Sequence, residues 1–523
     1  MHLSSLDLVV IAIYTLAVLA LSQLLSYRHS QQQPDSTDYV PTSRPMPWWA
    51  VGLSLIAANI SAEQIIGMSG SAYAFGLAIA SYEWMGAATL LIVGKFFLPI
   101  FLKNHIYTMP QFLRQRYGTA MQVTMAALYI GFYILVALTA TLWLGAIAVH
   151  VVTGLSMQMG LILLGLFAGN YALYVGLRSP PHADLLQVSL LILGGSVIAV
   201  IALERIAGGS GLAGLVNGFS ALVARAPEHF HIILRADNPY YKYVPGLSVL
   251  FGGMWIINLA YWGFNQYIIQ RALTAKNIAE VQNGVVLAAF LKLLVPILVV
   301  LPGVAAVILV PHLPRPDQAY PELMTMLPSG LLGLVSVALA AAIIASMRST
   351  LSSIATIFTM DVFSVIYKER SERQTLIVGR MAAITALGIA MVAAIPLLSG
   401  FDQAFQYIQD YNGFFTPGVV VVFLLGIAWK RTTQAGALVA AIGCPVVSVI
   451  FAIWLPGIPF MNRMAYVFCI LLILAGVVSL VEKYDRSSPI IALRDVSFST
   501  GKAFNICATA IVAILVVLYL KWW

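Results

Sequence analysis

A small set of polar side chains stands inside long apolar stretches of this sequence, and chemistry is expected there. The ionisable members are Glu63, Glu83, Asp184, Lys292, Arg348, Asp361 and Arg380. The uncharged members are Asn59, Gln64, Asn258, Asn265, Gln266, Gln406 and Gln409. Ionisable groups at membrane depth are energetically expensive and by default mark a pathway or a binding site. No nucleotide-binding loop, HExxH or GxSxG element accompanies them, so an ATP-driven pump or a hydrolase lacks its chemistry here.

The densest polar cluster is the stretch SLIAANISAEQIIGMSGS, residues 54–71. Serine, asparagine and glycine beside these polar groups weaken a helix, and backbone carbonyls then lose their helical partners. Such carbonyls are tolerated at membrane depth only where they line a cavity or are buried in protein. They suit a hard cation such as Na+, which discontinuous helices of transporters hold in this way. The alternative is that Asn59 and Gln64 act as hydrogen-bonding glue between helices.

A second stretch, MWIINLAYWGFNQYIIQR at 254–271, has the same character and begins five predicted helices later. Two polar-interrupted helices in corresponding positions predict an inverted repeat with the substrate between its halves. The helix after each stretch carries one ionisable group, Glu83 in ASYEWMG and Lys292 in AAFLKLLVP. A carboxylate and an ammonium at similar depth can both hydrogen-bond one polyhydroxylated solute. Nearby aromatic residues offer flat faces to sugar rings, although aromatics at this depth are more often packing residues.

These residues need long apolar elements to position them, and the composition provides them. The 523 residues are 60% hydrophobic and 9% charged, with a mean hydropathy of +0.91. No soluble domain hides so much apolar surface, so the solvent is a bilayer, which a helix of roughly 20 residues crosses. The fold class is therefore an all-α integral membrane protein with 14 transmembrane helices. They are predicted at 8–25, 48–73, 77–101, 120–150, 158–177, 184–206, 246–267, 279–310, 328–366, 375–399, 403–428, 433–455, 464–482 and 503–522.

Charge and cysteine usage set further bounds. Short connections on one side of the membrane carry fourteen Lys and Arg residues, whereas those on the other side carry only Arg315 and Arg463. The positive-inside rule then puts both termini outside the cell, and it explains the net charge of +8 without a nucleic acid partner. The first apolar run lacks a basic leader, so we expect a spanning helix and no cleaved signal. Cys444, Cys469 and Cys507 are expected to be small buried hydrophobes.

Long motifs in the chain closely resemble the sodium/solute symporter family, in its sodium/sugar cotransporter branch and above all the bacterial sodium/galactose symporter. They include WWAVGLSLIAANISAEQIIGMSGSAYAFGLAIASYEWM, NLAYWGFNQYIIQRAL, FLKLLVPILVVLPG, ATIFTMDVF and FQYIQDYNGFFTPG. The resemblance implies alternating access by a ten-helix inverted-repeat (5+5) core with discontinuous helices. The expected divisions are 1–46 (first helix and cytoplasmic loop), 47–206 (first repeat), 207–245 (extracellular loop), 246–428 (second repeat) and 429–523 (three C-terminal helices).

The resemblance also implies roles for individual residues. The sugar ligands would be Gln64, Glu83, Asn258, Lys292 and Gln409. The gates would be Tyr261 on the cytoplasmic side and Met68 and Phe405 on the outer side. The sodium ligands would be the carbonyls of Ala57, Ile60 and Ala342 and the hydroxyl of Ser346, with Ala345 at the position of a second, lost hydroxyl.

The chain departs from the family at several of these positions. Arg348 stands where the family has a small or polar residue, three residues beyond Ala345. Two interpretations of Arg348 stay open: it approaches the cation site or pairs with Asp184, or it reaches the cytoplasm or helix-end carbonyls. Ala137 and Gly86 replace an asparagine and a serine that are able to contact sugar hydroxyls. Pro180 and Pro181 interrupt an apolar stretch and are interpreted as a helix start.

The sequence therefore predicts a transporter of the cell membrane and not an enzyme. It would import a hexose-like sugar of the galactose or glucose class with sodium, which is co-transported and is no prosthetic group. Ala345 and Arg348 are expected to weaken the coupling. The partners are sugar, sodium and membrane lipid, with no nucleic acid. A sodium-independent or proton-coupled carrier and a sugar sensor on the same fold remain alternatives. The preferred sugar, the stoichiometry and the oligomeric state are left open.

Overall fold

The computed structural model describes the following residues: 3–14, 46–61, 63–104, 106, 109–174, 181–265, 269, 275–367, 371–482, 493 and 496–523; it does not describe the side chains of 171–174, 181–188 and 372. Within these ranges nine helical stretches are long and apolar enough to cross a membrane, or ten if one bent pair counts as a single span. An all-helical membrane protein is thereby confirmed. The exact count of fourteen spans stays a prediction, because the first predicted span lies largely outside the described residues.

The first polar stretch is a broken helix, as the sequence predicts. Helix α2 (Trp48–Asn59) ends where Ile60 turns extended, at φ −71° and ψ 109°. A π-helical turn, η1 (Glu63–Gly67), follows and runs into α3 (Met68–Phe75). Gly76 then takes φ +72°, which L side chains rarely adopt, and the chain turns into the next helical run there. That run comprises η2 (Gly76–Ala80), α4 (Ser81–Ile92), η3 (Val93–Phe97) and α5 (Leu98–Lys103).

The second polar stretch starts in the same way. Helices α12 (Ser248–Phe251) and α13 (Gly253–Phe264) end at Asn265, whose backbone is extended with ψ 122°. Gln266 and most of the residues up to 274 lie outside the described part of the chain. The long helix α15 (Ile278–Leu309) follows, and the side chain of Asn277 accepts a hydrogen bond from the Glu280 N–H at its start.

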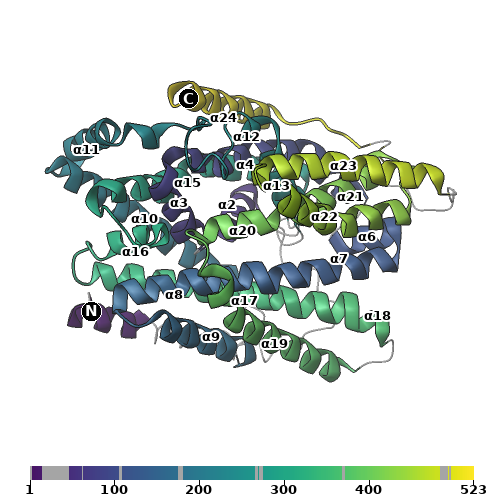
Figure 1. Ribbon diagram of the computed structural model, residues 1–523, viewed down its shortest axis with the longest axis horizontal. Helices are drawn as coiled ribbons and strands as arrows, with labels where there is room; N and C mark the ends of the chain where they lie inside the picture. The colour runs from purple at the N-terminus through teal and green to yellow at the C-terminus, as the bar shows by residue number, and fades with distance from the viewer. Residues whose placement is uncertain are drawn as a thin grey trace.

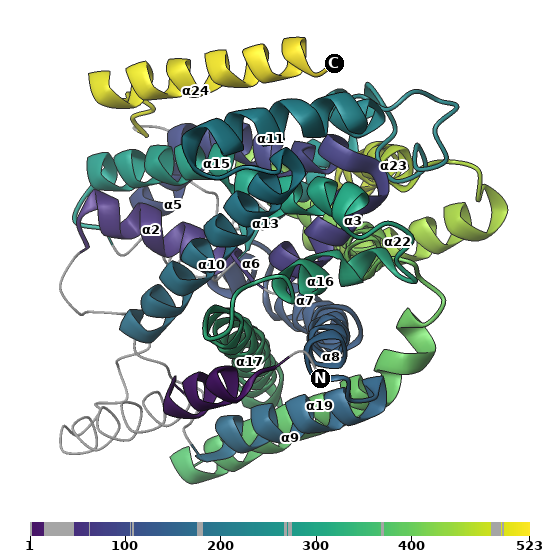
Figure 2. The same ribbon diagram turned by 90° about the vertical axis from the view of Figure 1, so that its left-hand side faces the viewer.

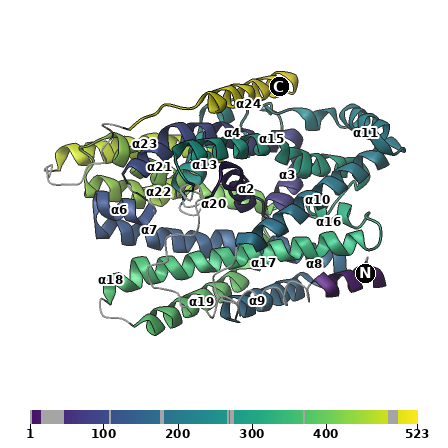
Figure 3. The same cartoon turned by 180° about the vertical axis from the view of Figure 1, so that it is seen from behind.

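The remaining elements surround these two. Between them lie α6 (Met109–Tyr117), α7 (Thr119–Phe132), η4 (Tyr133–Leu138), α8 (Thr139–Thr153), α9 (Met157–Tyr174), α10 (Pro181–Ala207), α11 (Gly211–Arg225) and η5 (Pro227–Phe230). After α15 come η6 (Pro316–Gln318), α16 (Ala319–Met324), α17 (Leu331–Ile357), η7 (Phe358–Phe363), α18 (Ser364–Ile366), α19 (Glu372–Leu398), α20 (Ala404–Asn412), α21 (Thr416–Ala428), α22 (Gln434–Trp454), α23 (Phe460–Val481) and α24 (Lys502–Lys521). Helices α8, α9, α17 and α19 form one side of the molecule and α24 lies on the opposite side (Figures 1 and 2). Seen from behind, α17 runs the length of the first side and continues into α18 (Figure 3).

Helix α15 packs along both halves of the broken helix through glycines. A Cβ on Gly284 would lie 2.8 Å from the Trp48 carbonyl oxygen. A Cβ on Gly52 would lie 2.7 Å from the Gly284 carbonyl oxygen. Near the other end of α15, a Cβ on Gly303 would lie 2.2 Å from the carbonyl oxygen of Ser69. Small residues let helix backbones approach this closely in membranes. Both halves of the broken helix are therefore fixed to one long neighbour.

A further break, beyond the two predicted from the sequence, separates α20 from α21. The two helices differ in direction by 41° across residues 413–415. The sequence FQYIQDYNGFFTPG does contain the signals, because Gly413 follows Asn412 and Pro417 stands in the first turn of the next helix.

Several smaller expectations are settled by the described residues. Helix α10 begins at Pro181, which confirms the helix start; Pro180 is not among the described residues. The 207–245 segment contains the fifteen-residue helix α11. Cys444 is buried, but the expectation of burial is wrong for Cys469 and Cys507, which are exposed. A thiol on an apolar, lipid-facing helix surface needs no burial, and the sequence pattern does not distinguish the two environments.

Candidate functional site

The two ionisable groups that follow the polar stretches meet each other. Lys292 Nζ of α15 lies 2.6 Å from Glu83 Oε2 of α4, and their side chains are 2% and 1% exposed. The same ammonium lies 4.9 Å from the ring centroid of Trp262 on α13, as a cation–π contact. A paired and hydrogen-bonded arrangement is what makes two buried charges tolerable. This ion pair joins the first half of the structure to the second.

The pair borders a cavity of about 270 Å³. All the predicted sugar ligands line it: Gln64, Glu83, Asn258, Lys292 and Gln409. The aromatic lining residues are Tyr82, Tyr129, Phe132, Tyr133, Tyr261, Trp262, Phe405 and Phe415. Trp84, which follows Glu83 in the chain, faces Tyr519 of α24 instead, at a ring separation of 6.0 Å. The structure thus gathers polar groups from α4, η1, α13, α15 and α20 around one space.

Both glutamines among the predicted sugar ligands have acceptor atoms to spare. Among the described residues, Gln64 Oε1 and Gln409 Oε1 are buried without a hydrogen-bond partner. Asn258 instead donates from Nδ2 to the Met254 carbonyl at 3.1 Å, which fixes its orientation within α13. Buried polar atoms are nearly always hydrogen-bonded, so an orphaned acceptor requires an explanation. Hydroxyl groups of a bound solute would satisfy both glutamine oxygens.

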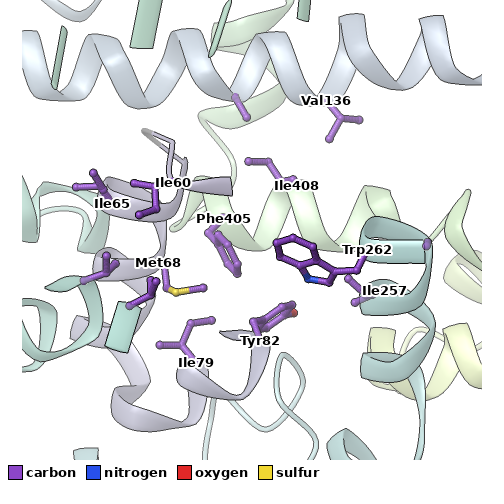
Figure 4. Packing of buried hydrophobic residues seen from close by; sticks show 14 of the residues in the cluster. Ile60, Ile65, Met68, Ile79, Tyr82, Val136, Ile257, Trp262, Phe405 and Ile408 are labelled. Atoms are coloured by element: carbon purple, nitrogen blue, oxygen red, sulfur yellow. The ribbon is translucent and has the colours of Figure 1, made fainter. Parts of the chain in front are cut away.

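Aromatic and sulfur-containing side chains close the cavity on the side where α20 begins. Met68, Tyr82 and Phe405 converge in the centre of the packed core (Figure 4). The rings of Tyr82 and Phe405 meet edge to face at 5.2 Å between centroids. The predicted outer gate residues, Met68 and Phe405, are therefore together and buried, and Tyr82 joins them.

Hydrogen bonds at the start of α20 lie next to the cluster of Met68, Tyr82 and Phe405. Ser71 Oγ donates to Gln403 Oε1 at 2.7 Å, and Gln406 Nε2 donates to Ser71 Oγ at 3.4 Å. The carboxylate of Asp317, in η6, accepts the Ala404 N–H at 2.7 Å and so caps the start of α20. A carboxylate at a helix N-terminus is favoured by the helix dipole. These contacts hold α20 against α3 and η6.

The lining continues in the other direction along α17. Ser346, Ser349, Thr350 and Ser353 line the cavity, together with Asn59 and Ser61 of the broken helix. Their spacing of i, i+3, i+4 and i+7 is a polar stripe on one helix face, a pattern that can be read from the sequence. Tyr261 lies on this side, and its hydroxyl accepts a hydrogen bond from Asn59 Nδ2 at 3.3 Å.

The residues assigned to sodium come from the end of α2 and from α17. Ile60 follows the last residue of α2, where helix carbonyls lose their i+4 partners. Ser346 shares the cavity lining with this break, and Ala342 is buried four residues earlier in α17. Ala57, Ala345 and these three positions keep their roles as predictions. A metal site built from three or more His, Cys, Asp or Glu side chains does not occur in the described part of the chain.

Arg348 lies buried within α17 and is 6% exposed. Both interpretations of its role, at the cation site or toward the cytoplasm, stay predictions. The side chain of Asp184, its expected partner, is outside the described residues.

Gly86 does not leave an open space in the cavity. A Cβ at this position would lie 2.9 Å from Asn258 Oδ1 and 3.2 Å from Trp262 Nε1. The absence of a side chain lets these two groups pack against α4, and a serine here would displace Asn258. Ala137 of η4, by contrast, lines the cavity itself. Of the two predicted losses of a hydroxyl contact, only the one at Ala137 concerns a wall of the cavity.

The comparisons with known proteins agree with one another. The family model described as "SSF: Sodium:solute symporter family" matches residues 39–443. The chain is 44% identical over 544 residues to the sodium/glucose cotransporter of Vibrio parahaemolyticus, across 100% of this chain and 99% of that protein. It is 32% identical to the mouse sodium/myo-inositol cotransporter 2 over 82% of this chain and 67% of that protein. It is 30% identical to the pig sodium/glucose cotransporter 1 over 84% of this chain and 71% of that protein.

Two solved structures support the fold alone, because both are less than 25% identical to this chain. A Na+-coupled sialic acid symporter in a substrate-bound outward-open state superposes with a TM-score of 0.74 at 21% identity, over 92% of this chain and 99% of that one. A nucleobase-cation-symport-1 family transporter in a closed conformation gives a TM-score of 0.51 at 13% identity, over 91% of this chain and 99% of that one.

From the buried ion pair of Glu83 and Lys292 we predict how substitutions change the stability of the protein. Removing one partner of a buried pair costs about 3–5 kcal/mol because the other charge is left uncompensated, whereas replacing both is nearly neutral. We therefore expect Glu83→Gln and Lys292→Met to lower the melting temperature of the purified protein, and the double variant to recover most of the loss. Thermal unfolding in detergent measures this, with Lys95→Met as a control at a partly exposed lysine. If the double variant instead loses the sum of the melting-temperature decreases of the two single variants, a direct pairing would be contradicted.

Asp317 lies in the connection between α15 and α17, and from its burial we predict that the packing of α20 depends on pH. Burial raises the pKa of this carboxyl to about 7, against the opposing effects of the Ala404 N–H and the Arg315 charge, with Asp402 adding to the rise. In a water-exposed, open arrangement the pKa would return to about 3.9. The closed arrangement then binds the proton more tightly, so its extra stability is present at low pH and is lost as pH rises through 7.

We expect α20 to be better protected from exchange at pH 5.5 than at pH 8. Hydrogen–deuterium exchange of residues 404–412, corrected for the intrinsic pH dependence, measures this. Asp317→Asn, which is neutral at both pH values, should remove the difference. Identical protection of the unaltered protein at both pH values would show that Asp317 stays buried when α20 moves.

Proposed function

The chain belongs to the sodium:solute symporter family, and from this premise we propose that it imports a hexose-like sugar together with sodium by alternating access. Members of this family are membrane transporters, and the protein is a multi-pass transporter and not an enzyme. Names of its relatives refer to glucose and to myo-inositol, both of which have six carbons and form a six-membered ring that carries several hydroxyl groups. A solute of this class is our choice of substrate.

The observation that carries this proposal is the ion pair together with the orphaned amide oxygens. Glu83 offers carboxylate oxygens, Lys292 offers N–H donors, and Gln64 and Gln409 offer acceptors, all on one cavity. A hydroxyl group both donates and accepts, so a polyol is matched to this mixture. The volume, about 270 Å³, is just below the roughly 300–1,000 Å³ of pockets for drug-sized ligands. It suits one sugar ring stacked on the neighbouring aromatics.

Transport needs access from either side in turn. We assign the Leu331 end of α17 to the outside, in keeping with the expected charge distribution and with both termini outside the cell. Met68 and Phe405 then close the site from the outside, and Tyr261 separates it from the cytoplasm. The halves of the core would be the five spans from α2 to α10 and the five from α12 to α21, within fourteen spans in all.

Sodium would bind where α2 ends. Carbonyls of Ala57, Ile60 and Ala342 and the hydroxyl of Ser346 are the proposed ligands, and the ion is co-transported cargo. Its entry is worth roughly 2.3 kcal/mol per 100 mV of membrane potential, in addition to the concentration term. Binding of sodium to the outward-open state would order the break and favour sugar, and sugar would favour sodium by the same factor.

The proposal is tested by reconstitution into proteoliposomes. We expect labelled glucose or galactose to accumulate when an inward sodium gradient is imposed, and Glu83→Gln with Lys292→Met to lose saturable uptake although the double variant folds. Losing hydrogen bonds to charged groups in a buried site costs about 1.5–3 kcal/mol each, so affinity should fall by one to two orders of magnitude for each group removed and by about two to four in the double variant. Uptake that equilibrates without accumulating would identify a sodium-independent carrier. Binding without any uptake would identify a sugar sensor.

The lost hydroxyl at Ala345 makes a prediction about sodium dependence. A water in place of this ligand costs up to about 2 kcal/mol of ordering, and the nearby arginine opposes a second positive charge. Transport should therefore depend only weakly on sodium. Ala345→Ser with Arg348→Ala should strengthen the dependence by more than the sum of the single changes if both residues act on one site. The measurement is the sodium concentration for half-maximal uptake, with Ser352→Ala on the same helix as control. Tight dependence in the unaltered protein would contradict this prediction.

A further inference from the structure

An ion pair outside the sugar cavity holds the far end of α20. Arg463, near the start of α23, donates from Nη2 to Asp410 Oδ1 at 2.5 Å. The arginine side chain is 9% exposed and the aspartate side chain 36%. The guanidinium also lies 4.9 Å from the ring centroid of Phe414. These contacts hold the last turn of α20 and the break that follows it.

The start of α23 touches two elements that carry proposed sugar ligands. Met464 lies against the break, since a Cβ on Gly413 would be 3.0 Å from its Cγ. The carbonyl oxygen of Met461 lies so close to the start of α13 that a Cβ on Gly253 would be only 2.4 Å from it. One turn of α23 is therefore fixed to α13, which carries Asn258, and to the end of α20, where Gln409 directly precedes Asp410.

Different interactions hold the two ends of α20. At its start, the contacts are the hydrogen bonds of Gln403 and Ala404 and the packing of Phe405, which open when the outer side opens in the proposed cycle. At its end, the contacts are the Arg463 ion pair, the cation–π contact and close packing at Gly413, and they lie beside a break of 41°. A helix released at one end and clamped at the other swings about the clamped end.

We propose that Arg463 is a positioning residue that clamps the pivot of α20 and thereby sets the orientation of Gln409 toward the sugar. Helix α23 lies outside the ten-helix core, so this gives a C-terminal helix a direct part in substrate affinity. The proposal rests on the proposed function for its sugar readout, and on the ion pair alone for its effect on α20.

Arg463→Gln is the main test variant, because the partly exposed Asp410 that remains can be hydrated. We expect KM for sugar to rise about 3- to 30-fold, which lies within the range of coupling between contacting residues, with kcat changed much less. Arg463→Lys should recover part of the affinity, since it keeps the charge but not the planar contact with Phe414. In the Gln409→Ala background, Arg463→Gln should raise KM little further. Arg431→Gln is the matched control, because Arg431 contacts the opposite end of α23 through the Leu480 carbonyl at 3.1 Å.

A second readout does not depend on transport. Hydrogen–deuterium exchange of residues 404–415 should be faster in Arg463→Gln than in Arg431→Gln, with or without sugar. If the unaltered protein transports no sugar but this difference is present, the function fails and the clamp stands. If KM and exchange are both unchanged in Arg463→Gln, the clamp is overturned. A fall in the melting temperature and in the amount of active protein, with KM unchanged, would equally overturn it, because Arg463 would then support only the fold.

Discussion

Two full charges, on Glu83 and Lys292, are held 2.6 Å apart where side chains are almost completely shielded from water. Neither helix that carries them can move away alone, because a lone buried charge costs several kcal/mol. The pair therefore keeps α4 and α15 together in every arrangement that excludes water from the cavity. A ligand can insert between the charges only if it replaces what each loses. A polyol does so, since its hydroxyls donate to the carboxylate and accept from the ammonium.

Helix α15 extends this constraint to α2 and α3. It meets α2 at Gly284, α4 at Lys292 and α3 at Gly303. The glycine contacts are between backbones, so these helices shift only as a unit, and packed interiors are not continuously deformable. The contacts at the start of α20 are of another kind. Gln403 and Ala404 make hydrogen bonds that water can replace, which makes α20 the element most easily moved.

The sequence predicts the parts of this arrangement that leave a local signature. The break after Asn59 is visible because polar and small residues interrupt an apolar run, and the ligands on α4 and α15 are visible because charges are rare there. Contacts between distant segments leave no such signature. Arg463 reads as a loop charge until the structure puts it beside Asp410, and Asp410 reads as one more polar residue of α20. Gly86 shows the same limit, because composition alone suggests a missing contact where the structure has tight packing.

In the proposed cycle, sodium and sugar must sense each other across a short distance, and the structure offers two connections. One is the hydrogen bond from Asn59, at the end of α2, to Tyr261, which lies one turn from Asn258 on α13. A single hydrogen bond contributes a net 0.5–1.5 kcal/mol or so, and therefore accounts for a coupling of about 2- to 13-fold at most. The other connection is the chain itself. Gln64 lies four residues beyond Ile60 in the π-helical turn η1, so ordering the carbonyl of Ile60 also orders the amide of Gln64. Because only three residues separate the proposed ligand Ile60 from Gln64, the break in the first helix is the better candidate for the place where sodium and sugar binding are coupled.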